Sequence, residues 1–179
     1  MHNYTRLERN IESTVYEGIV KLGFMEEESF GIYYDLGLLN YLLGTSFSSN
    51  EECYNELQNF ARDILRNYPI TITLEKGRFK FEISKEGVAY INHNASDKEF
   101  LKELIETVRN HQFTLADIQE IFKHQKKEYV CEHIENEEFQ YVLYFTDHSF
   151  DPYKYCFTFD AMGGYYHRLL DYDYEKLGI

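Results

Sequence analysis

Apolar residues recur at helical spacing in five stretches of the chain. Residues 5–22 show the pattern over the greatest length, and the other four stretches are residues 36–43, 49–65, 96–108 and 114–122. Each of the stretches begins at a side chain that can accept a hydrogen bond from the first helical turn, namely Thr5, Asp35, Ser49, Ser96 and Thr114. Helical periodicity behind a capping residue predicts a helix in each case.

Strict alternation of apolar and polar residues follows the helical stretches. Ile70, Ile72 and Leu74, for example, alternate with Thr71 and Thr73. The alternating segments form two groups, residues 70–74, 78–84 and 88–92 and then residues 127–134, 139–146 and 154–160. Alternation joined by short connections predicts antiparallel meanders with one face on a core.

The order of these elements predicts an α+β protein. N-terminal helices are followed by two three-stranded antiparallel meanders that a helix pair separates, and this order is compatible with a duplicated ααβββ unit. The chain closes with Tyr165, Tyr166, Leu169 and Leu170, which have the spacing of one helical face. Since no linker-like segment divides the chain, we expect residues 1–179 to form a single compact domain.

Composition and charge limit the classes of molecule that the chain can bind. A hydrophobic fraction of 44% can fill a core without disulfides or a structural metal, and 17 Tyr with 14 Phe suit either a core or a sticky surface. The formal net charge is −13, and residues 129–179 hold ten Asp and Glu against three Lys and Arg. Such a chain repels phosphate backbones and anionic membranes, so we expect no membrane partner and consider nucleic acid a poor one. A basic protein is compatible with this charge.

The N-terminal residues and the cysteines give indications of the cellular compartment. The first ten residues are polar and resemble no signal peptide, and no apolar run approaches the length of a membrane span. Cys53, Cys131 and Cys156 are odd in number and show no C-x-x-C spacing. Reduced thiols of a cytoplasmic protein fit this pattern best, and no cofactor is implied.

A metal site is not favoured. Cys131 and His133 are two residues apart on an expected strand, so they share a face, and Cys156 and His167 could complete a four-ligand set. In a sequential meander, however, Cys156 lies two strands from Cys131, which is about 10 Å. Cys131 and His133 therefore remain weak candidates. The chain has none of the local motifs of nucleophilic, zinc-dependent or phosphate-binding enzymes.

Residues 100–124 and the two strands after them follow the order of a winged helix-turn-helix. In a recognition helix over residues 114–124, the first turn would present Asp117 and Glu120 to the bases. The expected wing, residues 132–139, is acidic too. The electrostatic attraction that dominates DNA affinity is therefore missing. A DNA-binding regulator ranks only as a second alternative.

Four aromatic blocks carry a resemblance to a known family. They are "YYDLGLLNYLLG", "TLADIQEIF", "YCFTFD" and "YYHRLLDYDYEKL". These blocks resemble a family of small bacterial proteins that is defined only as a domain of unknown function. The resemblance implies a cytoplasmic bacterial protein and supplies no activity, cofactor or catalytic residue.

The C-terminal stretch, residues 159–179, leaves two functional hypotheses. As a structural clasp, it would belong to a non-enzymatic protein-interaction or regulatory module, whose acidic, tyrosine-rich surface binds another protein or a second copy. Alternatively, the chain would be a small-molecule binder or enzyme with a polar pocket. The residues expected to meet in that pocket are Cys156, Asp160, Tyr165, His167 and Arg168. We favour the interaction module, because the pocket has no recognisable motif.

Overall fold

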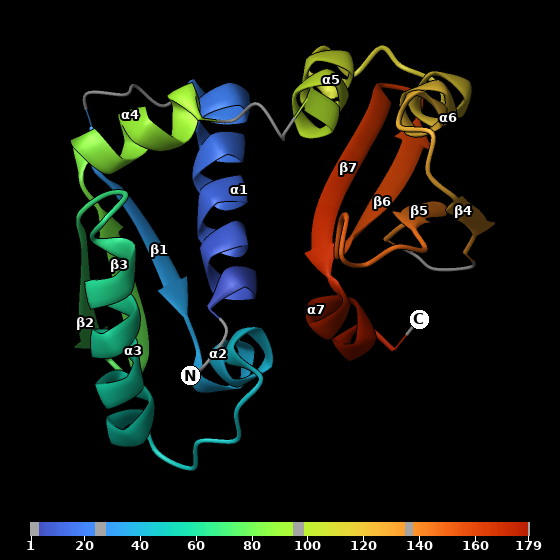
Figure 1. The fold of residues 1–179 in the computed structure, drawn as a ribbon. Helices are drawn as coiled ribbons and strands as arrows, with labels where there is room; N and C mark the ends of the chain where they lie inside the picture. The colour runs from blue at the N-terminus through green and yellow to red at the C-terminus, as the bar shows by residue number, and fades with distance from the viewer. Residues whose placement is uncertain (1–3, 24–27, 95–98, 135–137, 179) are drawn as a thin grey trace. The chain divides into compact units, whose positions relative to one another are not determined.

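A computed structural model describes residues 4–23, 28–94, 99–134 and 138–178. The chain divides into two compact units, residues 1–98 and 99–179 (Figure 1). Each unit is described by itself, and the expectation of one compact domain stays a prediction.

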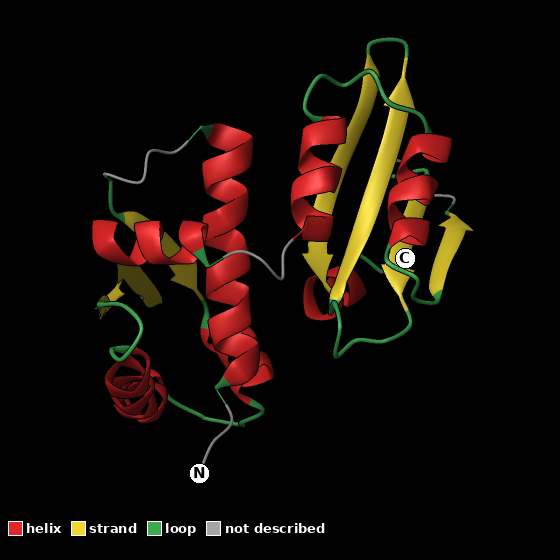
Figure 2. Cartoon of the chain, turned by 45° about the horizontal axis from the view of Figure 1, so that its top comes forward, coloured by secondary structure: helices red, strands yellow, loops and turns green. Residues whose placement is uncertain are grey.

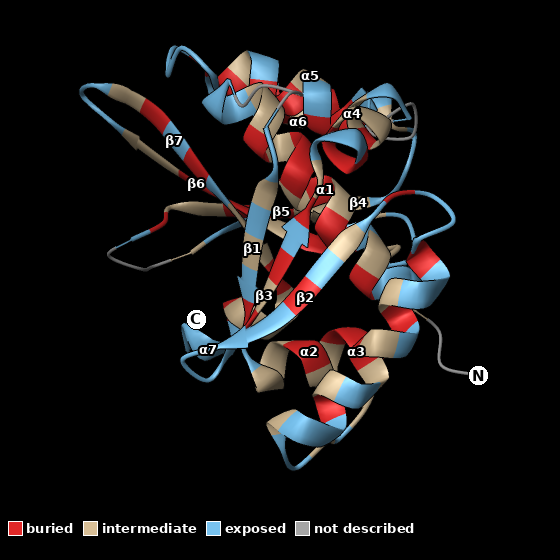
Figure 3. Cartoon of the chain, turned by 90° about the vertical axis from the view of Figure 1, so that its left-hand side faces the viewer, coloured by how far each residue is buried: buried red, intermediate tan, exposed pale blue. Residues whose placement is uncertain are grey.

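The first unit contains a three-stranded antiparallel sheet and four helices. Its elements are α1 (Thr5–Leu22), β1 (Phe30–Tyr34), α2 (Leu36–Leu43), α3 (Asn50–Ile64), β2 (Ile70–Glu75), β3 (Arg78–Ile83) and α4 (Lys85–His93). The strand order is β1-β3-β2. Phe81 on the central strand is fully buried and its ring meets those of Tyr34 and Phe60, so one face of the sheet forms the core with the helices (Figure 3).

Residues 88–92 belong to helix α4, and the prediction of a strand there was wrong. The Ser84 side chain accepts a hydrogen bond from the Gly87 N–H at 3.2 Å and caps the helix. Gly87 allows α4 to approach β3, since an added Cβ would lie 2.6 Å from the Ile83 side chain. The third strand of this sheet is β1, which the sequence pattern had not indicated.

The second unit packs two helices on a four-stranded antiparallel sheet. Its elements are α5 (Glu99–Val108), α6 (Leu115–His124), β4 (Tyr129–His133), β5 (Tyr141–Phe145), β6 (Tyr153–Asp160), β7 (Gly163–Leu170) and α7 (Asp171–Lys176). The strand order β4-β5-β6-β7 follows the chain, and α5 and α6 cover one face (Figure 2). Between them and the sheet, Phe100 makes edge-to-face contacts with Phe122, Phe145 and Tyr155.

Residues 163–170 form strand β7, so the helical face expected from Tyr165 and its neighbours was wrong. The strand pairs with β6 over eight positions, from Tyr153 opposite Leu170 to Asp160 opposite Gly163. This long ladder pairs the backbone groups of β6 that face β7, which a helix at residues 163–170 could not do. The terminal helix is the six-residue α7 that follows.

The α+β class is confirmed, whereas the expected ααβββ repeat is not the observed order. The first unit reads αβααββα and the second ααββββα. Within the described residues, no helix has the length and apolar character of a membrane span.

Candidate functional site

The register of the second sheet separates its side chains into two faces. Cys156 lies opposite His167 on the neighbouring strand, and Thr158 lies opposite Tyr165. Cross-strand partners share a face, and successive residues alternate between faces. We call the side away from α5 and α6 the acidic face. Its residues are Val130, Glu132, Val142, Tyr144, Lys154, Cys156, Thr158, Asp160, Gly163, Tyr165, His167 and Leu169.

The residues proposed for a polar pocket are divided between the two faces. Cys156, His167 and Tyr165 lie on the acidic face, and Asp160 stands at the tip of the β6–β7 hairpin. Arg168 belongs to the opposite face, because it follows His167 directly along β7. The structure therefore brings three of the five together and turns Arg168 away from them.

Arg168 lies among buried aromatic side chains beneath the helices. Its guanidinium is 4.1 Å from the centroid of the Tyr153 ring, and its cross-strand partner is Tyr155. The Tyr155 hydroxyl donates a hydrogen bond to Asp151 Oδ2 at 2.9 Å. Burial raises the pKa of Tyr155 well above its usual range, while the charge of Arg168 acts in the opposite direction. Arg168 thus has a packing role that its sequence pattern did not reveal.

The weak metal candidates also fall on different faces. Cys131 and His133 are paired with Leu143 and Tyr141, on the helix-covered side of the sheet, whereas Cys156 is on the acidic face. In the described part of the chain, no group of three or more His, Cys, Asp or Glu side chains is arranged to hold a metal ion.

The Cys156 thiol is not set up as a nucleophile. Its side chain is fully buried, and burial raises its pKa from 9.0 to about 12. A thiol with that pKa stays protonated at neutral pH and is inert towards electrophiles. Its position opposite His167 therefore does not form an activated pair.

A short helix covers one end of the acidic face. Tyr174 of α7 packs in a small cluster with Val142 and Cys156. The Lys154 ammonium lies 4.1 Å from the centroid of the Tyr174 ring and 3.8 Å from Asp171. His148 Nδ1 also contacts Asp171, at 2.9 Å. Lys154 is therefore neutralised by α7, and the terminal acidic run forms a docked helix instead of a solvated tail.

Among the described residues, the other end of the acidic face carries exposed side chains. Tyr165 is 36% exposed and rests on the His111 ring, with 4.8 Å between ring centroids. His167 is exposed and meets the edge of Phe139. At the hairpin tip, Asp160 Oδ1 accepts the N–H groups of Met162 and Gly163, so this carboxylate stabilises the turn.

Two glycines allow a loop to lie against the start of β7. The Gly164 N–H donates to the His111 carbonyl at 2.8 Å, and its own carbonyl lies 2.9 Å from His111 Nδ1. An added Cβ on Gly163 would lie 2.3 Å from that His111 carbonyl, and one on Gly164 would lie 2.5 Å from the Phe113 ring. The glycine pair therefore permits this close approach of the loop.

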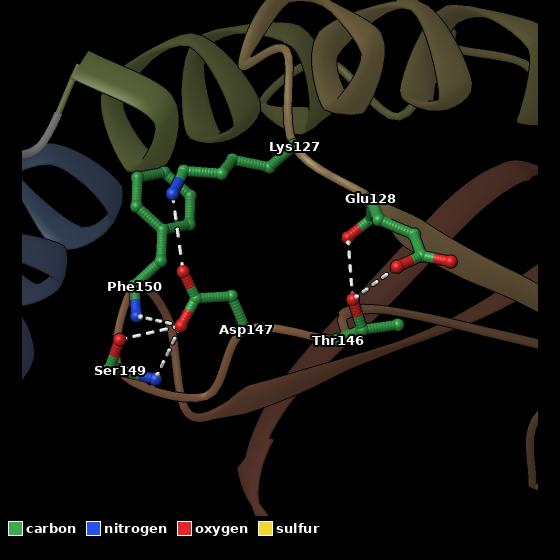
Figure 4. A network of polar contacts seen from close by, with 6 residues as sticks. All are labelled: Lys127, Glu128, Thr146, Asp147, Ser149 and Phe150. Carbon is green, nitrogen blue, oxygen red and sulfur yellow. Dashed lines mark hydrogen bonds and ion pairs between the residues drawn. The ribbon is translucent and has the colours of Figure 1, made fainter.

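A polar network fixes the beginning of β4 (Figure 4). Lys127 Nζ lies 3.2 Å from Asp147 Oδ2, while Asp147 Oδ1 accepts hydrogen bonds from Ser149 and from the Phe150 N–H. Next to it, the Thr146 hydroxyl donates to the Glu128 carboxylate at 3.2 Å, and the Thr146 N–H donates to the Glu128 carbonyl at 3.1 Å. These contacts hold β4 in register with β5.

Helix α6 combines a buried apolar side with a capped first turn and a paired lysine. Its buried side, with Ile118 and Phe122, faces the core of the unit. In its first turn, Asp117 bonds the Thr114 N–H at 2.7 Å in a capping box, and Lys123 is paired with Glu120. The cap predicted at Thr114 is thereby confirmed. The cap predicted at Thr5 was wrong, because Tyr4 is the N-cap residue of α1 and its side chain makes no capping hydrogen bond. The cap predicted at Ser96 lies outside the described residues.

The chain was compared with known proteins and families. No curated protein and no solved structure is significantly similar to it. A family model described as "Domain of unknown function, E. rectale Gene description (DUF3877)" matches residues 4–178. Because this match spans almost the whole sequence, the chain belongs to that family of domains of unknown function.

Proposed function

We propose that the protein is a non-enzymatic interaction module that binds a basic segment of another protein on the acidic face of its second unit. One observation carries this proposal: α7 covers only one end of that face, and Tyr165 and His167 stay exposed at the other end. Tyrosine is enriched at protein interfaces, because its ring supplies contact area and its hydroxyl supplies a hydrogen bond.

The charges of the second unit favour a basic partner. Residues 129–179 carry ten acidic and three basic side chains. On the acidic face, the Lys154 charge is already matched by Asp171, whereas Glu132 is exposed. Complementary charge speeds association and selects against acidic partners, even where it adds little to affinity.

The side chains of this face support binding more than catalysis. Cys156 is buried and its raised pKa keeps it neutral, and Asp160 is engaged by its own turn. Arg168, the group best suited to hold an anionic substrate, points to the other side of the sheet. The three free thiols are compatible with a reducing compartment such as the cytoplasm, where we place the protein.

Site-specific photo-crosslinking in cells tests the proposal. A photoreactive amino acid at His167 should capture a discrete protein, which mass spectrometry then identifies. The same amino acid at Thr73, an exposed strand position of the first unit, is the matched control. Capture at His167 should be lost when Glu132 is replaced by Lys, whereas Asp160 is kept because its carboxylate holds the hairpin turn. Equal capture from both positions, or capture that survives the charge reversal, would contradict the proposal.

A further inference from the structure

Strand β4 is an outer strand of the second sheet. The hydrogen bonds at its two ends show which of its backbone groups face β5. The Glu128 carbonyl accepts the Thr146 N–H, and the Ile134 N–H donates to the Gln140 carbonyl. Residues 128 and 134 therefore direct these groups towards β5. Because the backbone groups of a strand alternate in direction, those of Tyr129, Cys131 and His133 point away from the sheet.

In the described part of the second unit, nothing pairs with this outer edge of β4. Among the described residues, the structure has no hydrogen bond to the outward N–H or C=O groups of Tyr129, Cys131 and His133. Helix α6 packs against a face of the sheet at this strand, through Phe122 and Tyr129, and does not extend beyond it (Figure 2). The other outer strand is protected at Gly164, where the α5–α6 loop makes two hydrogen bonds to it.

We propose that the partner docks by adding an extended strand along the outer edge of β4, as a fifth strand of the sheet. This inference rests on the proposed function for the basic character of the segment, and it places that segment at β4, on the edge of the sheet opposite Tyr165 and His167 of β7. An exposed edge with unpaired backbone groups is a template for strand addition, in which main-chain hydrogen bonds supply much of the affinity. The network around Lys127 and Glu128 fixes the register of β4, so the same three residues always face the incoming strand.

The two sides of β4 define the side chains that the added strand should carry. On the acidic face, the added strand would lie beside Glu132, and opposite charges on neighbouring strands stabilise the pair. On the helix-covered side it would lie beside the half-buried Tyr129 and Cys131. The partner segment therefore alternates Lys or Arg with aliphatic residues. A second copy of this chain fits less well, because its β4 strand carries Glu132 and no Lys or Arg that could lie beside the carboxylate.

Amide hydrogen exchange measured by NMR on the full chain tests this mode of binding. The probe is a short peptide in which Lys and Val alternate, and the control is a peptide of the same composition with all Lys residues before the Val residues. In the free protein, the outward N–H groups of Tyr129, Cys131 and His133 should exchange faster than those of Val130 and Glu132. The alternating peptide should slow exchange at the three outward positions, and the control peptide should not.

A proline variant adds a test in the protein itself. Cys131→Pro removes an outward N–H that makes no bond to β5, and proline is tolerated at such edge positions. We expect the variant to fold and to bind the alternating peptide at least about tenfold more weakly, a loss of about 1.4 kcal/mol. Should the variant not fold, a peptide N-methylated on every second residue removes the same hydrogen bonds from the partner's side.

Three results would overturn the inference. Peptide binding that leaves exchange at Tyr129, Cys131 and His133 unchanged would exclude strand addition, although the acidic face could still bind a partner in another way. Absence of peptide binding would also reject the β4 edge, while crosslinking from His167 would still report on the proposed function. A concentration-dependent dimer that Cys131→Pro abolishes would show that the occupant is a second copy.

Discussion

Cys156 and His167 are directly opposite each other on β6 and β7, yet their environments differ completely. The Cys156 thiol is fully buried beneath α7, whereas the His167 ring is exposed. A Cys–His pair suggests nucleophilic catalysis when only the sequence is known. Here burial raises the pKa of the thiol to about 12, which removes the thiolate that such chemistry needs.

The three thiols should therefore differ in their reaction with a thiol reagent such as iodoacetamide. Cys53 and Cys156 are fully buried and their pKa values are raised, whereas Cys131 is partly exposed on β4. In the native protein at neutral pH, Cys131 should be alkylated first and the other two only after unfolding. Peptide mapping by mass spectrometry measures this order. Rapid native labelling of Cys156 would contradict the buried, neutral thiol.

Stability should fall in alkaline solution because of the same two buried thiols. Burial raises the pKa of Cys53 from 9.0 to about 11 and that of Cys156 from 9.0 to about 12. The unfolded chain releases these protons near pH 9, while the folded chain retains them. Their contribution to stability is therefore complete below pH 9 and is lost as the pH rises towards 11 and 12.

Urea unfolding at a series of pH values from about 8 to about 10.5 measures this loss. The midpoint should decrease over this range, and the decrease should be smaller in a Cys53→Ala, Cys156→Ala double variant. Cys131→Ala is the matched control, because it removes a thiol that is not buried, and it should leave the slope unchanged. An equal slope in the double variant would assign the effect to other groups.

The helices that begin with a cap were predictable because their signals are local. Asp35, Ser49 and Thr114 each accept a hydrogen bond from their own first helical turn, as their sequence positions indicated. Helix α4 has the same signal at Ser84, but the short apolar run over residues 88–91 also fits a strand. Periodicity alone does not separate the two in so short a segment, and the cap was the deciding feature.

The conformation of β7 could not be predicted as reliably from the sequence, since it depends on hydrogen bonding to another strand, β6. Tyr165, Tyr166, Leu169 and Leu170 fit a helical face, while the buried residues Gly164, Tyr166 and Leu170 fit an alternating strand. Pairing with all eight residues of β6 selects the strand. This choice also fixes the candidate site, because it places His167 with Cys156 and turns Arg168 to the opposite face.

Gly164→Ala should destabilise the second unit. An added Cβ would lie 2.5 Å from the Phe113 ring, which is itself packed against Phe157 and Phe159. Overpacking of this kind costs about 1–3 kcal/mol. Gly31→Ala in β1 is the control, because its Cβ would meet only the Lys80 side chain at 3.6 Å. Urea unfolding of both variants measures the difference, and a Gly164→Ala protein as stable as the control would contradict the close contact.

The pKa of the Asp147 carboxyl should lie well below that of an ordinary aspartate. Two neighbouring side chains should contribute unequally to this lowering. Hydrogen bonds from Ser149 and then from Lys127 lower its pKa from 3.8 to about 2. The stabilisation by this network is thus present above pH 3.8 and is lost as the pH falls towards 2. A titration of the side-chain carboxyl carbon followed by NMR measures the pKa directly.

Variants of the two neighbours separate their contributions. Ser149→Ala should raise the pKa of Asp147 more than Lys127→Met does, because the Ser149 hydroxyl makes the larger contribution. Ser46→Ala, at an exposed position of the first unit, is the control and should leave the pKa unchanged. If Lys127→Met alone restored an ordinary pKa, the ion pair would dominate and the loop between β5 and β6 would depend on Lys127 for its position. That result would also make the register of β4 sensitive to salt, since a surface ion pair is screened by added electrolyte.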